Sequence, residues 1–177
     1  MKNWMKVSMF CLTALMFIGC DRITKNLAKE HLMYREPISY FHNTVRLEYV
    51  ENTGAALSLG DQLSKPLSFW LLSVIPLIFL LLVFAYAISK MSELSPLKVL
   101  SFSLIIAGGL GNIIDRIMFD RHVTDFMNLG IQNLRTGIFN FADVCVSAGV
   151  IGLLISYRDN KPKSEPVLKI DDGQANS

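Results

Sequence analysis

Two aspartates, Asp125 and Asp143, are the residues whose types and positions best fit a chemical role in this chain. Asp143 is the single charged residue in the run 136–157, and Asp125 lies among β-branched and aromatic residues in Val123–Phe126. A strand through Asp125 would lead back towards the start of that run, so we expect the two carboxylates to meet. Repulsion between carboxylates in a desolvated site raises the pKa of one, and the pair retains a shared proton. Such a pair supplies the general base and general acid that activate water against an amide.

A structural interpretation of Asp143 stays open at this point. A carboxylate in the first turn of a helix is stabilised by the positive end of the helix dipole. Asn140 lies three residues earlier, on the same helical face. A charge at membrane depth needs either a partner or a function, and the residue types alone allow both.

A second group of polar residues closes the apolar run 99–114. Small residues let membrane helices approach closely, and three glycines lie at positions 108, 109 and 111. The residues that follow, at helical spacings of three and four, are Asn112, Asp115 and Arg116. For Asp115 we predict a local or cross-helix ion pair that ends the helix.

Other catalytic patterns are weak. His122 and Asp125 are three residues apart, but His31 and His42 lie in a different loop and there is no HExxH. The GxSxG motif of serine hydrolases is also missing, and Ser147 has no base near it in the sequence. The sequence therefore predicts no metal and no cofactor.

The elements that must position these residues are predicted from charge placement. Charged residues make up 18% of the chain, below the quarter typical of soluble domains. The runs 7–20, 67–89, 99–114 and 136–157 contain Asp143 as their only charge. Because a helix needs about 20 apolar residues to cross a bilayer, we predict an all-α integral membrane protein. Its four transmembrane helices are expected at roughly 4–20, 67–89, 97–115 and 139–157, in a single domain, 1–157.

The connecting segments predict a small sheet on one side of the membrane. In the loop 21–66, residues 44–50 alternate as a strand does and residues 55–59 fit a short helix. The loop 116–138 contains a second strand candidate at 121–129. The polar tail 158–177 is predicted to be disordered. Lys and Arg are dense at 90–98 and 158–169, which favours cytoplasmic termini and places the loops outside.

Two alternatives to an enzyme remain. A small multi-pass transporter or channel component would also carry polar residues in its spans, although no internal repeat is visible here. The segment Phe17–Cys20 resembles a lipoprotein cleavage site, which would make Cys20 a lipid anchor. Phe17 fits such a site poorly, and three further spans follow. A net charge of +2 gives no basic surface for nucleic acid.

The polar residues fall into five ordered blocks that resemble the lipoprotein signal peptidases, or signal peptidase II. The blocks are Asp21–Lys25, Glu51–Ala56, Gly108–Arg116, Val123–Phe126 and Phe139–Asp143. The resemblance extends over roughly 4–157. The chain departs from the family pattern at Leu57, where Phe is common, and at 136–138, where the family often has Trp-Pro.

The resemblance implies an aspartyl endopeptidase of the bacterial cytoplasmic membrane that removes signal peptides just before the lipidated cysteine of prolipoproteins. By motif position, the catalytic pair falls on Asp125 and Asp143, near the extracytoplasmic face. Residues that hold the pair and the substrate fall on Asp21, Lys25, Asn52, Gly54, Gly108, Asn112, Arg116, Asn140 and Ala142, with Asp115 supporting Arg116. The implied partners are the lipidated prolipoprotein, membrane lipid and peptide-like inhibitors such as globomycin, bound by a monomer.

Overall fold

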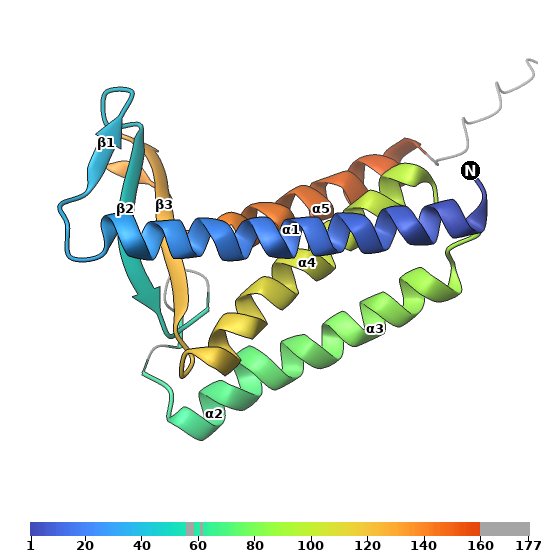
Figure 1. Cartoon of the computed structure of the whole chain (residues 1–177), viewed down its shortest axis with the longest axis horizontal. Helices are drawn as coiled ribbons and strands as arrows, with labels where there is room; N and C mark the ends of the chain where they lie inside the picture. The colour runs from blue at the N-terminus through green and yellow to red at the C-terminus, as the bar shows by residue number, and fades with distance from the viewer. Residues whose placement is uncertain (56–58, 61, 160–177) are drawn as a thin grey trace, which may run out of the picture.

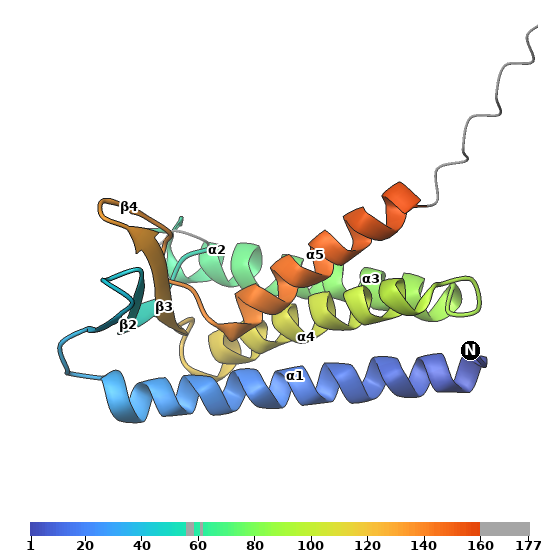
Figure 2. The same cartoon turned by 90° about the horizontal axis from the view of Figure 1, so that it is seen from above.

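The computed structural model of the chain describes residues 1–55, 59–60 and 62–159. Its helices are α1 (Asn3–Leu32), α2 (Lys65–Phe69), the π-helical turn η2 (Trp70–Val74), α3 (Ile75–Ser89), α4 (Pro96–Met118) and α5 (Phe141–Asp159). Its strands are β1 (Ile38–Tyr40), β2 (Val45–Asn52), β3 (Val123–Ile131) and β4 (Leu134–Arg135). Figure 1 shows the long helices running alongside one another with the sheet across one end. The N-terminus and the end of α5 both lie at the opposite end of the molecule from the sheet (Figures 1 and 2).

In the described part of the chain, four helical segments are long and apolar enough to cross a membrane: Asn3–Leu32, Lys65–Ser89, Pro96–Met118 and Phe141–Arg158. Apolar side chains on their outer surface face away from the protein, as with Leu82 and Leu154, which are 65% and 66% exposed. Such a surface suits lipid rather than water. The predicted fold class, four membrane helices with a small sheet, is confirmed.

The first helix extends further than predicted. The sequence places the end of the first span at residue 20 and a loop from 21, but α1 continues to Leu32. Asp21, Lys25, Ala28 and Leu32 recur on one face of this extension, and all four are buried. The charges that end the apolar run therefore point into the protein, where they are paired, and the helix is not interrupted.

The described strands form one antiparallel sheet in the order β1-β2-β3-β4, with the predicted strands at its centre. Val50 of β2 lies opposite Asp125 of β3, and Arg46 lies opposite Asn128. The register shifts between Leu47 and Val50, as at a β-bulge. Residues 56–58, within the predicted short helix 55–59, and 160–177, within the predicted tail, lie outside the described residues.

Helix α4 is the centre of the bundle, packing most extensively against α5 and also against α1 and α3. Close approach depends on the glycines predicted for this purpose. A Cβ on Gly108 would collide with the Ala142 carbonyl oxygen and the Val146 side chain of α5. A Cβ on Gly111 would lie 2.6 Å from a carboxylate oxygen of Asp21. The glycines thus bring α1, α4 and α5 together directly below the sheet.

At the opposite end, Lys6 fastens α1 to the turn between α3 and α4. Its buried ammonium donates to the carbonyl oxygens of Met91, Ser92 and Leu94 at 3.1, 2.8 and 2.6 Å. Phe10, one turn further along α1, is 2% exposed in the main apolar core. The segment before Cys20 is therefore part of the packed fold, and Cys20 itself lies within the continuous helix α1.

Candidate active site

Asp143 is held in place by the start of its own helix. Asn140 directly precedes α5, and its Oδ1 accepts a hydrogen bond from the Asp143 backbone N–H at 3.1 Å. In return, Asp143 Oδ2 accepts from the Asn140 backbone N–H at 3.0 Å. This reciprocal arrangement is a capping box, which satisfies two backbone donors that a helix start leaves free. Asp143 therefore does stabilise the first turn of α5, as the structural interpretation expects, but only its Oδ2 atom takes part in this cap.

The predicted strand brings Asp125 to this helix start. Asp125 is 4% exposed on β3, and its Oδ1 accepts a hydrogen bond from Asn140 Nδ2 at 2.6 Å. Its Oδ2 accepts from Asn52 Nδ2, at the end of β2, at 3.0 Å. One asparagine, Asn140, therefore contacts both aspartates.

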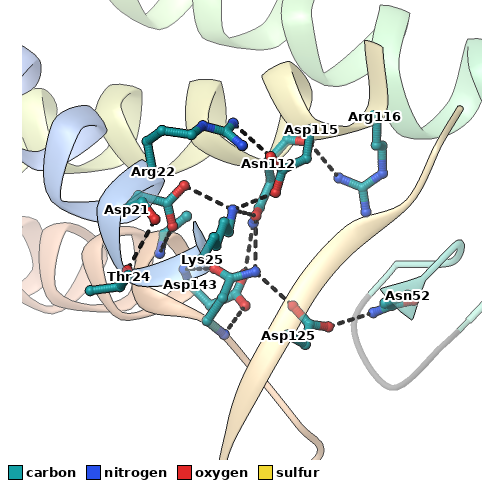
Figure 3. Close-up of polar contacts among 12 residues, drawn as sticks. Asp21, Arg22, Thr24, Lys25, Asn52, Asn112, Asp115, Arg116, Asp125 and Asp143 are labelled. Carbon is teal, nitrogen blue, oxygen red and sulfur yellow. Dashed lines mark hydrogen bonds and ion pairs between the residues drawn. The ribbon is translucent and has the colours of Figure 1, made fainter. Parts of the chain in front are cut away.

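A second asparagine completes the link between the carboxylates (Figure 3). Asn112 of α4 donates through Nδ2 to the free oxygen of Asp143, Oδ1, at 2.9 Å. Its own Oδ1 accepts from Asn140 Nδ2 at 3.1 Å and from Lys25 Nζ at 3.0 Å. Because Lys25 can only donate, these contacts fix which end of the Asn112 amide faces Asp143.

Beneath the asparagines lies a buried cluster of charges from α1 and α4. Lys25 Nζ lies 2.8 Å from Asp21 Oδ2 and 2.8 Å from Asp115 Oδ2. Arg22 reaches Asp115 Oδ1 at 2.6 Å. Asp21 also accepts the backbone N–H of Ala142, in the first turn of α5, at 2.9 Å. This cluster locks α1, α4 and α5 in register below the two aspartates.

Asp115 makes the cross-helix ion pairs that its position predicts, but it does not pair with Arg116. Neighbouring residues on a helix point in different directions, so Asp115 faces α1 while Arg116 faces the loop after β2. Arg116 Nη2 donates to the Gly54 carbonyl oxygen at 2.7 Å. The Gly54 N–H in turn donates to Asn52 Oδ1 at 2.9 Å. Arg116 thereby holds the loop that presents Asn52 to Asp125, and any support from Asp115 reaches Arg116 through its nearby negative charge and not through a direct ion pair.

Both aspartates line a cavity of about 390 Å³, together with Asn52, Asn112 and Arg116. Several other residues that line this cavity have no role predicted from the sequence, namely Val123, Thr136, Gly137, Ile138, Val146 and Ser147. Helical spacing could have found Ser147, which is four residues after Asp143. The segment 136–138 carries no motif, and only the return of the chain from β4 to α5 places it there.

The surroundings of Asp125 raise its pKa towards the neutral range. Burial raises the pKa of Asp125 to about 6, the charge of Asp143 acts in the same direction, and hydrogen bonds from Asn52 and Asn140 oppose the rise. A carboxylic acid beside a carboxylate, both facing one cavity, can donate and accept protons in a single reaction. Within the described ranges 1–55, 59–60 and 62–159, no group of three His, Cys, Asp or Glu residues is placed to hold a metal ion.

Comparison with known proteins matches this geometry to a family. The family model described as signal peptidase (SPase) II matches residues 13–158, most of the chain. The chain belongs to the signal peptidase II family. The matched segment contains every residue of the site described above, and this membership favours a peptidase over a transporter or channel component.

Individual relatives agree with the signal peptidase II assignment. A lipoprotein signal peptidase of Streptococcus pneumoniae is 38% identical over 152 residues, covering 85% of this chain and 93% of that protein. One from Borrelia duttonii is 32% identical over 168 residues, covering 92% and 96%. A solved structure described as a bacterial membrane enzyme superposes with a TM-score of 0.74 at 25% identity, covering 91% of this chain and 95% of that one.

Proposed function

We propose that this member of the signal peptidase II family is an aspartic endopeptidase that cleaves bacterial prolipoproteins just before their diacylglyceryl-modified cysteine. Family membership supports the removal of signal peptides from prolipoproteins. The observation that supports the aspartic mechanism is the pair Asp125 and Asp143, linked through Asn112 and Asn140 and facing one cavity.

In the proposed reaction, Asp125, whose pKa is raised, acts first as the general acid, and Asp143 acts first as the general base. Water attacks the carbonyl carbon of the scissile bond, giving its proton to Asp143, while Asp125 protonates the carbonyl oxygen. The product of this step is a neutral gem-diol. As the C–N bond breaks, Asp143 passes its proton to the leaving nitrogen and one gem-diol hydroxyl returns a proton to Asp125. The pair is then ready for another cycle.

The site also fits a substrate held by the membrane. It lies where the helices meet the sheet, which we place at the extracytoplasmic face, and the cavity extends along α5 to Val146 and Ser147. An apolar signal helix can remain in the bilayer while its scissile bond reaches the aspartates. Each buried methylene of the diacylglyceryl chains contributes about 0.8 kcal/mol of membrane affinity, so lipid holds the substrate at this depth. Peptide-like inhibitors such as globomycin would occupy the same cavity of a monomer.

The test compares Asp125→Asn and Asp143→Asn with the unchanged protein, purified in detergent and incubated with a lipidated prolipoprotein. Each substitution keeps the size of the side chain and removes the carboxylate, so we expect cleavage to fall by at least about 100-fold. Asp120→Asn is the matched control, because Asp120 is exposed and forms a surface ion pair with Lys65, away from the cavity. Cleavage by either site variant at the control rate would contradict the aspartic mechanism. Cleavage of the unlipidated precursor at the same rate would contradict recognition of the lipid.

A further inference from the structure

A second cavity, of about 400 Å³, follows one face of the sheet away from the aspartates. It shares Asn52 and Asp125 with the catalytic cavity and also shares residues 136–138. Beyond Asp125 its lining comes from Arg46, Glu48 and Val50 of β2, Asn128 of β3 and Arg135 of β4. The two cavities are therefore neighbouring parts of one surface, and a peptide chain leaving the scissile bond can follow it.

The far end of this groove holds two arginines that converge on one residue. Arg46 Nη2 donates to Asn43 Oδ1 at 3.3 Å, and Arg135 Nη1 donates to the Asn43 carbonyl oxygen at 2.7 Å. Arg135 also donates to the side chain and backbone of Asn128. Among the residues that the structure describes, neither arginine forms an ion pair, and the buried Nε of Arg46 has no hydrogen-bond partner. Two half-buried guanidinium groups thus meet at one place, and no carboxylate in the described part of the chain pairs with either of them.

The sheet register gives the distance between this pair and the aspartates. Arg46 lies opposite Asn128, which is three residues from Asp125 on β3, and Val50, opposite Asp125, is four residues from Arg46. At about 3.3 Å per residue of strand, the separation is roughly 10–13 Å. An extended peptide covers that distance in three to four residues. When the lipidated cysteine is counted as the first residue of the mature lipoprotein, the two arginines face the third or fourth residue of that protein.

The expected path of the substrate agrees with this direction. β2 and β3 run across the ends of the long helices rather than along them (Figure 1). The diacylglyceryl group keeps the cysteine at the bilayer surface, so the residues that follow must also begin along that surface. The groove on the sheet lies in the same direction.

We propose that Arg46 and Arg135 form a subsite for an acidic side chain at the third or fourth residue of the mature lipoprotein. The proposal rests on the proposed function and specifies its substrates. Guanidinium groups bind carboxylates through paired N–H donors, and an incoming carboxylate also relieves the repulsion between the two cations. Glu48 lines the groove two residues closer to Val50 than Arg46 does. An acidic side chain at the second residue of the mature lipoprotein would lie nearer to the Glu48 carboxylate and would gain no binding energy. The preference for an acidic residue therefore depends on its position.

The experiment uses lipidated prolipoprotein peptides that differ only by Asp or Asn at one of the positions two to five. The readout is the ratio of kcat/KM for the Asp peptide to that for the Asn peptide at each position. We expect the ratio to be about five to ten at the third or fourth position, the size of a partly exposed charge-assisted contact. At the second position we expect it to be one or less. In the double variant Arg46→Gln/Arg135→Gln, the ratio at the favoured position falls to about one.

Arg35→Gln is the matched control, because Arg35 is exposed and lies outside both cavities. It should keep both the ratio and the activity. With a matched Lys peptide added to the set, Arg46→Glu should transfer the preference from Asp to Lys, a gain that a misfolded protein cannot show. A ratio near one at the third and fourth positions of the unchanged protein, or a ratio that survives in the double variant, would overturn the subsite. Failure of the proposed function is distinct, since no peptide would then be cleaved at any position.

Discussion

Replacing Lys25 by Met tests whether the buried charge cluster holds the site together. The side chain of Lys25 is 1% exposed, and its ammonium contacts Asp21 and Asp115, each at 2.8 Å, and Asn112 at 3.0 Å. Met has a similar length but no charge. Asp115 keeps its pair with Arg22, whereas Asp21 is left as a buried carboxylate without a counter-charge. Removing one partner of a buried pair lowers the free energy of unfolding by about 3–5 kcal/mol.

The assay is thermal unfolding in detergent, followed by a maleimide dye that reacts with Cys145 as it becomes accessible. Cys145 is 3% exposed in the folded protein, and a Cys11→Ser/Cys20→Ser background removes the exposed thiol and the half-buried one. The second variant, Lys25→Met/Asp21→Asn, removes the unpaired charge, while the amide oxygen of the substituted side chain can still accept from the Ala142 N–H. We expect it to recover most of the lost stability. Activity should stay low in both, because the Asn112 amide loses a contact that fixes its orientation.

Two results would refute this reasoning. Stability of Lys25→Met within about 1 kcal/mol of the unchanged protein would mean that the cluster is solvated rather than desolvated. A double variant no more stable than Lys25→Met would mean that the loss comes from packing and not from the unpaired carboxylate of Asp21.

Two further predictions concern protonation and helix spacing. Asn52→Ala removes a hydrogen-bond donor to the Asp125 carboxylate, so the pKa of Asp125 rises above about 6. Because the reaction needs Asp125 in its protonated form, the alkaline limb of the kcat/KM pH profile should move to higher pH, by up to about one unit. A limb that stays in place or moves to lower pH would contradict the assignment of the proton to Asp125. Gly108→Ala should force α4 and α5 apart, lowering stability by about 1–3 kcal/mol and reducing activity. The control for Gly108→Ala is Gly19→Ala, because a Cβ at Gly19 meets nothing within 4 Å. We expect this control to unfold at or above the temperature of the unchanged protein. Equal effects of the two substitutions would exclude helix spacing as the cause.

The elements of the fold were predictable because their signals are local. Membrane helices require only sufficient apolar length, and the uncharged runs supply it in four places. The alternation at 44–50 and the β-branched residues around Asp125 gave the two central strands. The end of the first helix was misplaced, since the charge of Asp21 marks where lipid contact ceases and not where helical hydrogen bonding does.

The site was predictable where a residue is conspicuous in its surroundings. Asp143 is the one charge in an apolar run, and the spacing to Asn140 indicates a shared helical face. The choice of partners was not predictable in the same way. Asp115 is adjacent to Arg116 in sequence but pairs with Arg22 and Lys25, because partners are chosen by which helix faces it across the glycine contacts of α4.

By itself, the sequence determined the class of protein, the number of membrane helices and the two aspartates on which the proposed chemistry depends. Tertiary structure alone decided through which hydrogen bonds Asn112 and Asn140 join those aspartates, and that Arg46 and Arg135 meet at Asn43. The physical reason is the distance along the chain over which each property is decided. Burial in a bilayer depends on the composition of a continuous stretch, whereas a hydrogen bond or a shared subsite depends on segments far apart in the chain being placed within about 3 Å.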